Sequence, residues 1–408
     1  MTEVTVLDVR LYDKSIGTLT LLPGDRILFT FDDGYVADAT RPALSVSFKD
    51  AFGALITDIR PTQTRLSPFF SNLLPEGAMR DYLAARANVN PAREFYLLWV
   101  LGRDLPGALK VLPLNGDGLP PETEDVQKTA AKNADEGGLL RFSLAGVQLK
   151  FSAVRQAAGG FTIPVEGVGG SWIVKLPSTT HRGVPENEFA MMELARRIGI
   201  DVPETQMVPL RKIEGLPAGL ESEGDTAFVI KRFDRSDTAG PIHIEDFAQV
   251  FGLYPADKYG KVSYRNIAQV IWVETGEIGI TEFLRRFVFN VLIGNGDMHA
   301  KNWSLIYPDR RTPQLAPAYD FLSTIGYIAK DKLALTFVDT KAFSSLNRDR
   351  FSRFAAKVGL PEKLTLDTVK ETVARFRETW QHSKDLPIDA RLRKTIDEHL
   401  PTIPIWQS

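Results

Sequence analysis

The chain has 408 residues, of which 44% are hydrophobic and 25% are charged, and its formal net charge is −2. This composition excludes a wholly disordered chain and leaves room for two or three globular domains. The small negative charge excludes a bulk attraction for nucleic acid, and the lack of cysteine excludes disulfides, thiolate nucleophiles and cysteine-based zinc sites.

The first ten residues include Glu3 and Asp8 and contain no apolar core of a signal peptide. No apolar run along the chain approaches the roughly 18 residues that a membrane helix needs. We therefore expect a cytoplasmic protein with no membrane partner.

Residues 1–114 are expected to form a subdomain that opens on a small sheet. Apolar and β-branched runs at 4–7, 17–21 and 26–31 are separated by Gly, Pro and Asp, which predicts an antiparallel meander. Two helices are expected at 76–87 and 91–101, the second beginning at Asn90-Pro91 with a capping Asn. These helices would cover one face of the sheet.

Residues 115–138 change composition towards Gly, Pro, Ala and charge. Six acidic side chains stand there against two lysines, and few apolar side chains are present to offset the entropy of ordering. We expect a mobile acidic linker.

Residues 139–243 are predicted to form a five-stranded lobe, with strands at 147–154, 161–163, 171–176, 205–210 and 227–231. Lys175 closes an apolar run, so it either extends to water or reaches the phosphates of a ligand. The helix expected at 185–199 places Glu188 on its inner edge, which makes Glu188 the candidate ion-pair partner of Lys175. Residues 232–235 resemble a hinge.

Residues 244–408 are predicted to be helical. The helices are expected at 244–252, 262–274, 281–293, 350–358, 368–382 and 389–400. A β-rich lobe, a hinge and an all-helical lobe indicate an α+β, two-lobed protein-kinase-like fold, with an extra subdomain at the amino-terminal end.

The stretch GNGDMHAKN at 294–302 follows an apolar helix and concentrates polar side chains in one turn. Asp297 and Asn302 reproduce the D-x-x-x-x-N spacing of a kinase catalytic loop, in which Asp orients the acceptor hydroxyl and Asn holds magnesium. Asp320, after an expected hairpin, would supply a second oxygen ligand for Mg²⁺. The spacing alone is weak evidence, because D-x-x-x-x-N occurs by chance in many proteins, and on that spacing alone a turn residue at the end of a helix is the more ordinary interpretation of Asp297.

Several further stretches together resemble the HipA-like serine/threonine kinases, toxins of bacterial toxin-antitoxin modules. The similar stretches are FSNLLPEG at 70–77, LPGAL at 105–109, FSLAGVQLK at 142–150, IVKLP at 173–177, ENE at 186–188, KRFDR at 231–235, and the motifs at 294–302 and 319–320. Their order along the chain is more specific than any one motif, although the loop at 145–150 has a single glycine rather than the pattern of eukaryotic kinases.

The resemblance implies a role for each matching residue. Asp297 would be the catalytic base, Asn302 and Asp320 would bind Mg²⁺, and Ser143 would be autophosphorylated. The implied ATP-binding residues are Ala145, Gly146, Val147, Gln148, Lys150, Lys175, Lys231, Phe233, His299, Lys301, Asn302, Tyr319 and Asp320, with Lys231 and Phe233 acting through backbone groups.

Three functions stay open at this point. The first is an active toxin kinase that phosphorylates a protein, with an aminoacyl-tRNA synthetase as one example. The second is an inactive, ATP-binding pseudokinase that serves as a corepressor, because the resemblance implies a helix-turn-helix antitoxin repressor as partner and contact with DNA only through it. The third is a small-molecule or lipid kinase, because fold does not fix function.

Overall fold

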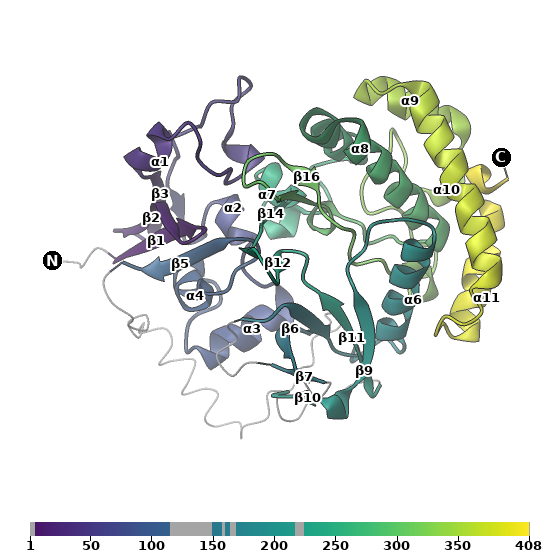
Figure 1. Ribbon diagram of the computed structural model, residues 1–408, viewed down its shortest axis with the longest axis horizontal. Coiled ribbons are helices and arrows are strands. Elements are labelled where there is room, and N and C mark those ends of the chain that lie inside the picture. Colours follow the sequence, from purple (N-terminus) through teal and green to yellow (C-terminus); the bar gives the residue numbers. More distant parts are fainter. Residues whose placement is uncertain (1–4, 115–148, 157–159, 164–168, 217–223, 408) are drawn as a thin grey trace.

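A computed structural model describes residues 5–114, 149–156, 160–163, 169–216 and 224–407. The predicted linker at 115–138 lies outside the described residues, as do Ser143, Ala145, Gly146, Val147 and Gln148 of the predicted phosphate loop. In Figure 1 the amino-terminal subdomain, the β-rich lobe and the mainly helical lobe follow one another, and the two chain ends lie on opposite sides of the molecule.

The subdomain is built on an antiparallel sheet with the strand order β4-β3-β2-β1-β5. Its strands are β1 (Thr5–Leu11), β2 (Lys14–Leu22), β3 (Arg26–Phe31), β4 (Thr62–Gln63) and β5 (Leu109–Pro113). The predicted meander is confirmed, because β1 pairs with β2 and β2 with β3. The helices of the subdomain are α1 (Asp33–Ala37), α2 (Pro68–Ser71), α3 (Gly77–Arg86) and α4 (Glu94–Leu101).

Two expectations for this subdomain hold only in part. Helix α4 begins at Glu94 rather than Pro91, because Asn90 closes a turn in which its carbonyl accepts from the Arg93 N–H at 3.0 Å. Helix α3 covers the first sheet with Ala84, but its Met79 packs into the core of the next lobe and its Tyr82 meets Phe151 there edge-on. Helix α3 therefore joins the subdomain to the β-rich lobe.

The β-rich lobe contains a six-stranded sheet with the order β10-β7-β6-β8-β11-β9. Its strands are β6 (Lys150–Arg155), β7 (Phe161–Thr162), β8 (Trp172–Lys175), β9 (Thr205–Pro209), β10 (Ile213–Glu214) and β11 (Thr226–Lys231). The sequence predicted five strands. The sixth, β10, is only two residues long and pairs in parallel with β7, so it left no periodic signal.

The helical lobe is built around α8, against which α10 packs one buried face. Its helices are α7 (Phe247–Val250), α8 (Tyr264–Ile293), α9 (Arg348–Val358), α10 (Glu362–His382) and α11 (Ala390–His399). Helix α6 (Val184–Arg197) belongs to the β-rich lobe. The two helices predicted at 262–274 and 281–293 are present as the two halves of α8, which a kink with non-helical dihedral angles at Gly276 separates.

The second lobe is not all-helical. Residues predicted to begin a helix at Ile244 form strand β14 (His243–Asp246), which pairs with β15 (Ser304–Tyr307), and β15 pairs in turn with β16 (Gln314–Leu315). Burial alternates along β14, because His243 and Glu245 are buried and Ile244 and Asp246 are less so. This period of two residues is typical of a strand, but the stretch is too short for the sequence to reveal it. A small hairpin of β12 (Arg235–Ser236) and β13 (Gly240–Pro241) precedes it.

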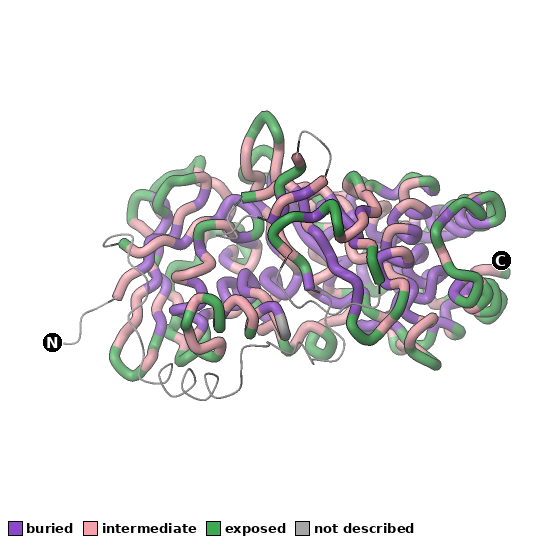
Figure 2. Tube along the Cα trace, turned by 90° about the horizontal axis from the view of Figure 1, so that it is seen from below, coloured by how far each residue is buried: buried purple, intermediate pink, exposed green. Residues whose placement is uncertain are grey.

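Short 3-10 helices complete the structure. They are η1 (Val46–Phe48), η2 (Leu210–Lys212), η3 (Pro255–Asp257), η4 (Ala300–Asn302), η5 (Thr324–Gly326), η6 (Phe343–Ser345), η7 (Leu400–Thr402) and η8 (Pro404–Trp406). Figure 2 shows buried backbone running through both lobes, and the largest apolar core combines α6, part of β11 and the helices of the second lobe. None of the helices in the described ranges combines the length and the apolar character that crossing a bilayer requires.

Candidate active site

The loop that carries Asp297 begins where α8 ends. Gly294 closes the helix in the left-handed region, at φ 66° and ψ 46°, which glycine adopts without cost. The buried side chain of Asn295 then donates to Oδ1 of Asn290 at 2.7 Å and accepts from the Asp297 N–H at 2.9 Å. Asn295 therefore ties the position of Asp297 to the end of the buried helix.

The carboxyl group of Asp297 is accessible from solvent, yet the surrounding protein removes part of its water. That burial raises the pKa of Asp297, while the hydroxyl of Tyr259, which donates to Oδ1 at 2.5 Å, opposes the rise. The negative charge of Asp320 raises the pKa further. Asp297 is thus a hydrogen-bond acceptor whose proton affinity the site increases, as a general base requires.

Asn302 and Asp297 lie together at the two ends of the D-x-x-x-x-N motif. The side-chain amide of Asn302 donates to the backbone carbonyl of Asp297 at 2.9 Å. This hydrogen bond fixes the side-chain nitrogen of Asn302.

Lys175 lies between two carboxylates from different parts of the chain. Its ammonium group contacts Glu188 of α6 and Asp320 of the second lobe. Burial by itself lowers the pKa of Lys175, but the charges of Asp320 and Glu188 outweigh it and raise the pKa above its usual value. Lys175 is therefore charged, and the predicted pairing with Glu188 is present.

Asp320 has the left-handed φ of 57°, which is uncommon for a residue other than glycine. Burial raises the pKa of Asp320, but Lys175 and the more distant Lys150 outweigh it and hold the pKa well below its usual range. Lys150 is exposed and stands directly opposite Lys175 in the register of β6 and β8. The site therefore keeps Asp320 ionised and ready to bind a cation.

The predicted hinge residues lie at the end of β11. The Lys231 N–H donates to the carbonyl of Glu204 at 2.8 Å, so the sheet already uses this donor. The Phe233 ring stacks on Tyr319, with centroids 5.7 Å apart and planes 29° from parallel. Phe233 and Tyr319 form an aromatic contact between the hinge and the second lobe.

His299, Lys301 and Tyr319 are expected to line a nucleotide, and in the structure their side chains have different partners. Burial lowers the pKa of His299 to about 3, and its buried Nδ1 has no hydrogen-bond partner among the described residues. The Tyr319 hydroxyl donates to the Lys301 carbonyl at 2.9 Å. The Lys301 ammonium, in contrast, donates to Asn72 Oδ1 at 2.9 Å and to Asp246 at 2.8 Å, so it ties the loop to the subdomain.

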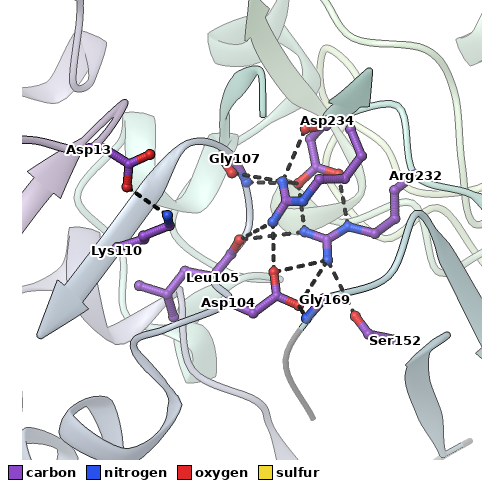
Figure 3. Close-up of polar contacts among 10 residues, drawn as sticks. Asp13, Asp104, Leu105, Gly107, Lys110, Ser152, Gly169, Arg232 and Asp234 are labelled. Carbon is purple, nitrogen blue, oxygen red and sulfur yellow. Dashed lines mark hydrogen bonds and ion pairs between the residues drawn. The ribbon is translucent and has the colours of Figure 1, made fainter. Parts of the chain in front are cut away.

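A charge network fixes the hinge to the subdomain (Figure 3). Arg232 donates through Nε and Nη2 to the two oxygens of Asp234, at 2.9 and 2.8 Å, and approaches Asp104 at 3.4 Å. Arg235 donates to Asp104 at 2.8 Å, and the Gly107 N–H donates to Asp234 at 2.8 Å. Burial raises the pKa of Asp234, but its arginine partners outweigh it and lower that pKa.

This network explains two of the family-like motifs in physical terms. Gly107 of the LPGAL stretch has φ 76°, and a Cβ there would lie 2.8 Å from the backbone nitrogen of Ile244. Arg232 of the KRFDR stretch also donates to Ser152 of β6 at 3.3 Å, so one side chain links the hinge, the sheet and the subdomain. Sequence reasoning missed Asp104, Arg232 as a network residue, Asn295 and Tyr259. Asp104 and Tyr259 bond to partners that are distant in the sequence. Arg232 and Asn295 have partners nearby, but no pattern in the sequence marks those pairs as bonded.

The described residues suit Mg²⁺ by the chemistry of their donors. Asp320 and Asn302 offer hard oxygen atoms, and Mg²⁺ bound with nucleotides takes one or two protein ligands and completes its shell with water and phosphate oxygens. In the described part of the chain there is no group of three or more His, Asp or Glu side chains that could hold a metal by itself.

Comparison with known proteins shows two consecutive family matches. Residues 7–112 match the HipA N-terminal domain, and residues 142–380 match the HipA-like C-terminal domain. A protein named putative kinase Y4dM from Sinorhizobium fredii is 56% identical over 411 residues, covering 100% of this chain and 99% of that protein. The serine/threonine-protein kinase toxin HipA of Shewanella oneidensis is 25% identical, covering 92% of this chain and 88% of the toxin.

A solved structure supports the fold. The structure described as the Shewanella oneidensis toxin-antitoxin system of HipA, HipB and its operator DNA matches with a TM-score of 0.73 and 22% identity. The match covers 98% of this chain and 96% of that one. The two-lobed kinase-like fold predicted from the sequence is confirmed.

Proposed function

Because this chain belongs to the HipA-like kinase family, we propose that it is an ATP-dependent serine/threonine protein kinase that acts as a growth-inhibiting toxin. The observation that carries the proposal is the position of Lys175, charged and in contact with both Glu188 and Asp320. This is the arrangement by which kinases hold phosphates next to a metal-binding carboxylate. We also propose the division into 1–114, 115–138, 139–243 and 244–408 as the domain organisation.

In this proposal each residue has a distinct task. Lys175 and Lys150 bind the phosphates of ATP, while Phe233, Tyr319 and His299 surround the base and sugar. Asp320 and Asn302 would hold Mg²⁺, which supplies charge neutralisation for the transferred phosphoryl group when bound. Asp297 orients the acceptor hydroxyl and takes its proton.

Lys301 receives a different task from the one expected. Its ammonium is held by Asn72 and Asp246, so we assign it to fixing the catalytic loop against the subdomain. Lys231 contributes through its carbonyl, because its N–H is bound to Glu204.

The biological setting is proposed from the family. A relative named as a toxin kinase, and the HipA, HipB and operator DNA complex of a structural relative, favour a helix-turn-helix antitoxin repressor as partner. Contact with DNA would then run through the antitoxin. A translation component such as an aminoacyl-tRNA synthetase, in the cytoplasm, is the proposed protein substrate.

Ser143 is proposed as a site of regulatory autophosphorylation. A phosphate adds about 1.5 to 2 negative charges beside a loop that must bind ATP, so modification is expected to lower ATP affinity. Calorimetry on phosphorylated and phosphatase-treated protein tests this, with Ser143→Ala as control. Equal affinities, or phosphate on Ser152 instead, would exclude the mechanism.

The deciding experiment incubates a cell lysate with labelled MgATP and either the wild-type protein or Asp297→Asn. Mass spectrometry should find phosphoserine or phosphothreonine on a protein only with the wild type, with a difference of about 100-fold or more in rate. Binding of ATP without any transfer would support the pseudokinase instead. A labelled small molecule or lipid would support the third function.

A further inference from the structure

The hydroxyl of Tyr259 is hydrogen-bonded to one carboxylate oxygen of the candidate catalytic base. It lies in the loop between η3 and α8, and its phenolic O–H donates to Oδ1 of Asp297. Its ring meets His299 edge-on, with centroids 4.8 Å apart. Tyr259 is nevertheless 42% exposed, so its ring is not part of the apolar core.

The loop that carries Tyr259 is held by groups other than the tyrosine itself. Lys258 forms an ion pair with Glu76 of the subdomain at 2.9 Å, and its carbonyl accepts from the Ala300 N–H at 3.3 Å. These contacts keep the loop beside the catalytic motif. The half-exposed ring of Tyr259 can therefore rotate away without opening the core or releasing the loop.

The phenol of Tyr259 is chemically similar to the acceptor hydroxyl that the catalytic base of a kinase must bind. The catalytic Asp of a kinase accepts a hydrogen bond from the acceptor hydroxyl, and that contact must lie within hydrogen-bond reach. A phenolic O–H is the same kind of donor as the hydroxyl of serine or threonine. An acceptor hydroxyl and the Tyr259 hydroxyl would therefore compete for Oδ1 of Asp297.

We propose that Tyr259 stands in the place of the acceptor hydroxyl on Asp297, so that a substrate must displace its phenol before phosphoryl transfer. This inference rests on the proposed kinase function. Tyr259 then restrains transfer to water and admits only acceptor segments that bind well enough to move it. Replacing Tyr259 by Phe keeps the ring that meets His299, so the affinity for ATP should not depend on the Tyr259 hydroxyl.

The opposite role, in which Tyr259 positions Asp297 for catalysis, predicts an effect of opposite sign. Hydrolysis of MgATP by water separates the two, because water is the smallest acceptor and requires no identified protein substrate. The proteins to compare are the full-length wild type, Tyr259→Phe, Asp297→Asn, the double variant, and Tyr254→Phe. Tyr254 is the matched control, since it lies immediately before η3, close to this loop in the sequence, and its ring packs near Arg65 instead.

Tyr259→Phe is expected to raise the rate of MgATP hydrolysis about tenfold. The substitution removes one hydrogen bond to a charged group, which stabilises the state in which the Tyr259 phenol is bound to Asp297. The dissociation constant of MgATP should stay unchanged, and Tyr254→Phe should match the wild type. Asp297→Asn should cancel the gain in the double variant.

A rate for Tyr259→Phe equal to or below that of the wild type overturns the proposal, and a decrease assigns Tyr259 to positioning instead. A gain that persists in the double variant overturns it as well, because the effect would not pass through Asp297. A wild-type protein that binds no MgATP would overturn the kinase function itself, which calorimetry distinguishes from both results.

Discussion

The ammonium group of Lys175 contacts the carboxylate of Asp320, although the two residues lie 145 positions apart and belong to different lobes. Lys175 is buried and Asp320 is partly accessible. Their contact therefore links the two lobes in the interior of the protein. In the proposed reaction both groups exchange this contact for ATP phosphates and a cation. The lobes are therefore linked by a bond that substrate binding must rearrange.

Asp320→Asn should remove the Mg²⁺ dependence of ATP binding while the fold is kept. Asn suits this test better than Ala, because Asn tolerates the left-handed φ of 57° at this position. Loss of the carboxylate leaves Lys175 paired with Glu188. Calorimetric titration of ATP with and without Mg²⁺ measures the effect, and a preserved Mg²⁺ dependence would remove Asp320 from the metal site.

Arg232→Lys should destabilise the protein by about 2 kcal/mol or more, because lysine keeps the charge but cannot reproduce two parallel hydrogen bonds to Asp234 in a buried network. Lys110→Gln is the matched control. Lys110 pairs with Asp13 in an exposed contact, also visible in Figure 3, and its loss should change the free energy of unfolding by less than about 1 kcal/mol. Denaturant unfolding compares the two, and equal losses would contradict the structural role of Arg232.

Glu245 makes stability depend on pH at the contact between the subdomain and the second lobe. The buried carboxyl accepts from the hydroxyls of Ser45 and Tyr307 and from the Val46 N–H at 2.9 Å. Burial raises the pKa of Glu245 to about 7, from an ordinary value of 4.5. The folded state therefore binds the proton more tightly than the unfolded state does.

For such a group the added stability is full below the unfolded pKa and is lost as the pH rises through the folded pKa. The free energy of unfolding of the wild type should thus fall by up to about 3 kcal/mol from about pH 4.5 to about pH 8. Glu245→Gln, a neutral analogue of the protonated acid, should lack this part of the fall. Denaturant unfolding across that range tests the prediction, and parallel curves for the two proteins would refute it.

Gly107→Ala should be strongly destabilising, for two separable reasons. A φ of 76° strains any residue with a Cβ, and here the Cβ would also lie 2.8 Å from the Ile244 backbone nitrogen. Gly53→Ala isolates the first cost, since Gly53 has φ 83° and a methyl group there would meet no described atom within 4 Å. We expect about 1 to 2 kcal/mol for Gly53→Ala and at least about 3 kcal/mol for Gly107→Ala, measured by denaturant unfolding. Equal losses of stability in the two variants would show that the backbone next to Gly107 moves to accommodate the added methyl group.

The order of the elements and the local geometry of the candidate catalytic motif could be predicted from the sequence because both are local. Gly294 ends α8 through its own backbone freedom, and the D-x-x-x-x-N spacing brings Asn302 onto the carbonyl of Asp297 within a single turn. Alternating and helical apolar patterns also identified most strands and helices. Elements too short for a period, such as β10 and β14, escaped prediction.

Contacts between distant segments were decided only by the tertiary structure. Tyr259 reaches Asp297, Arg232 reaches Asp104, and Lys301 turns towards Asn72 because packing brings particular faces of separate elements together. A sequence records which side chains can form hydrogen bonds or ion pairs, but several partners of the right chemistry exist for each. The choice among them depends on which partner the fold brings within about 3 Å. The spacing of residues along the sequence does not specify that distance.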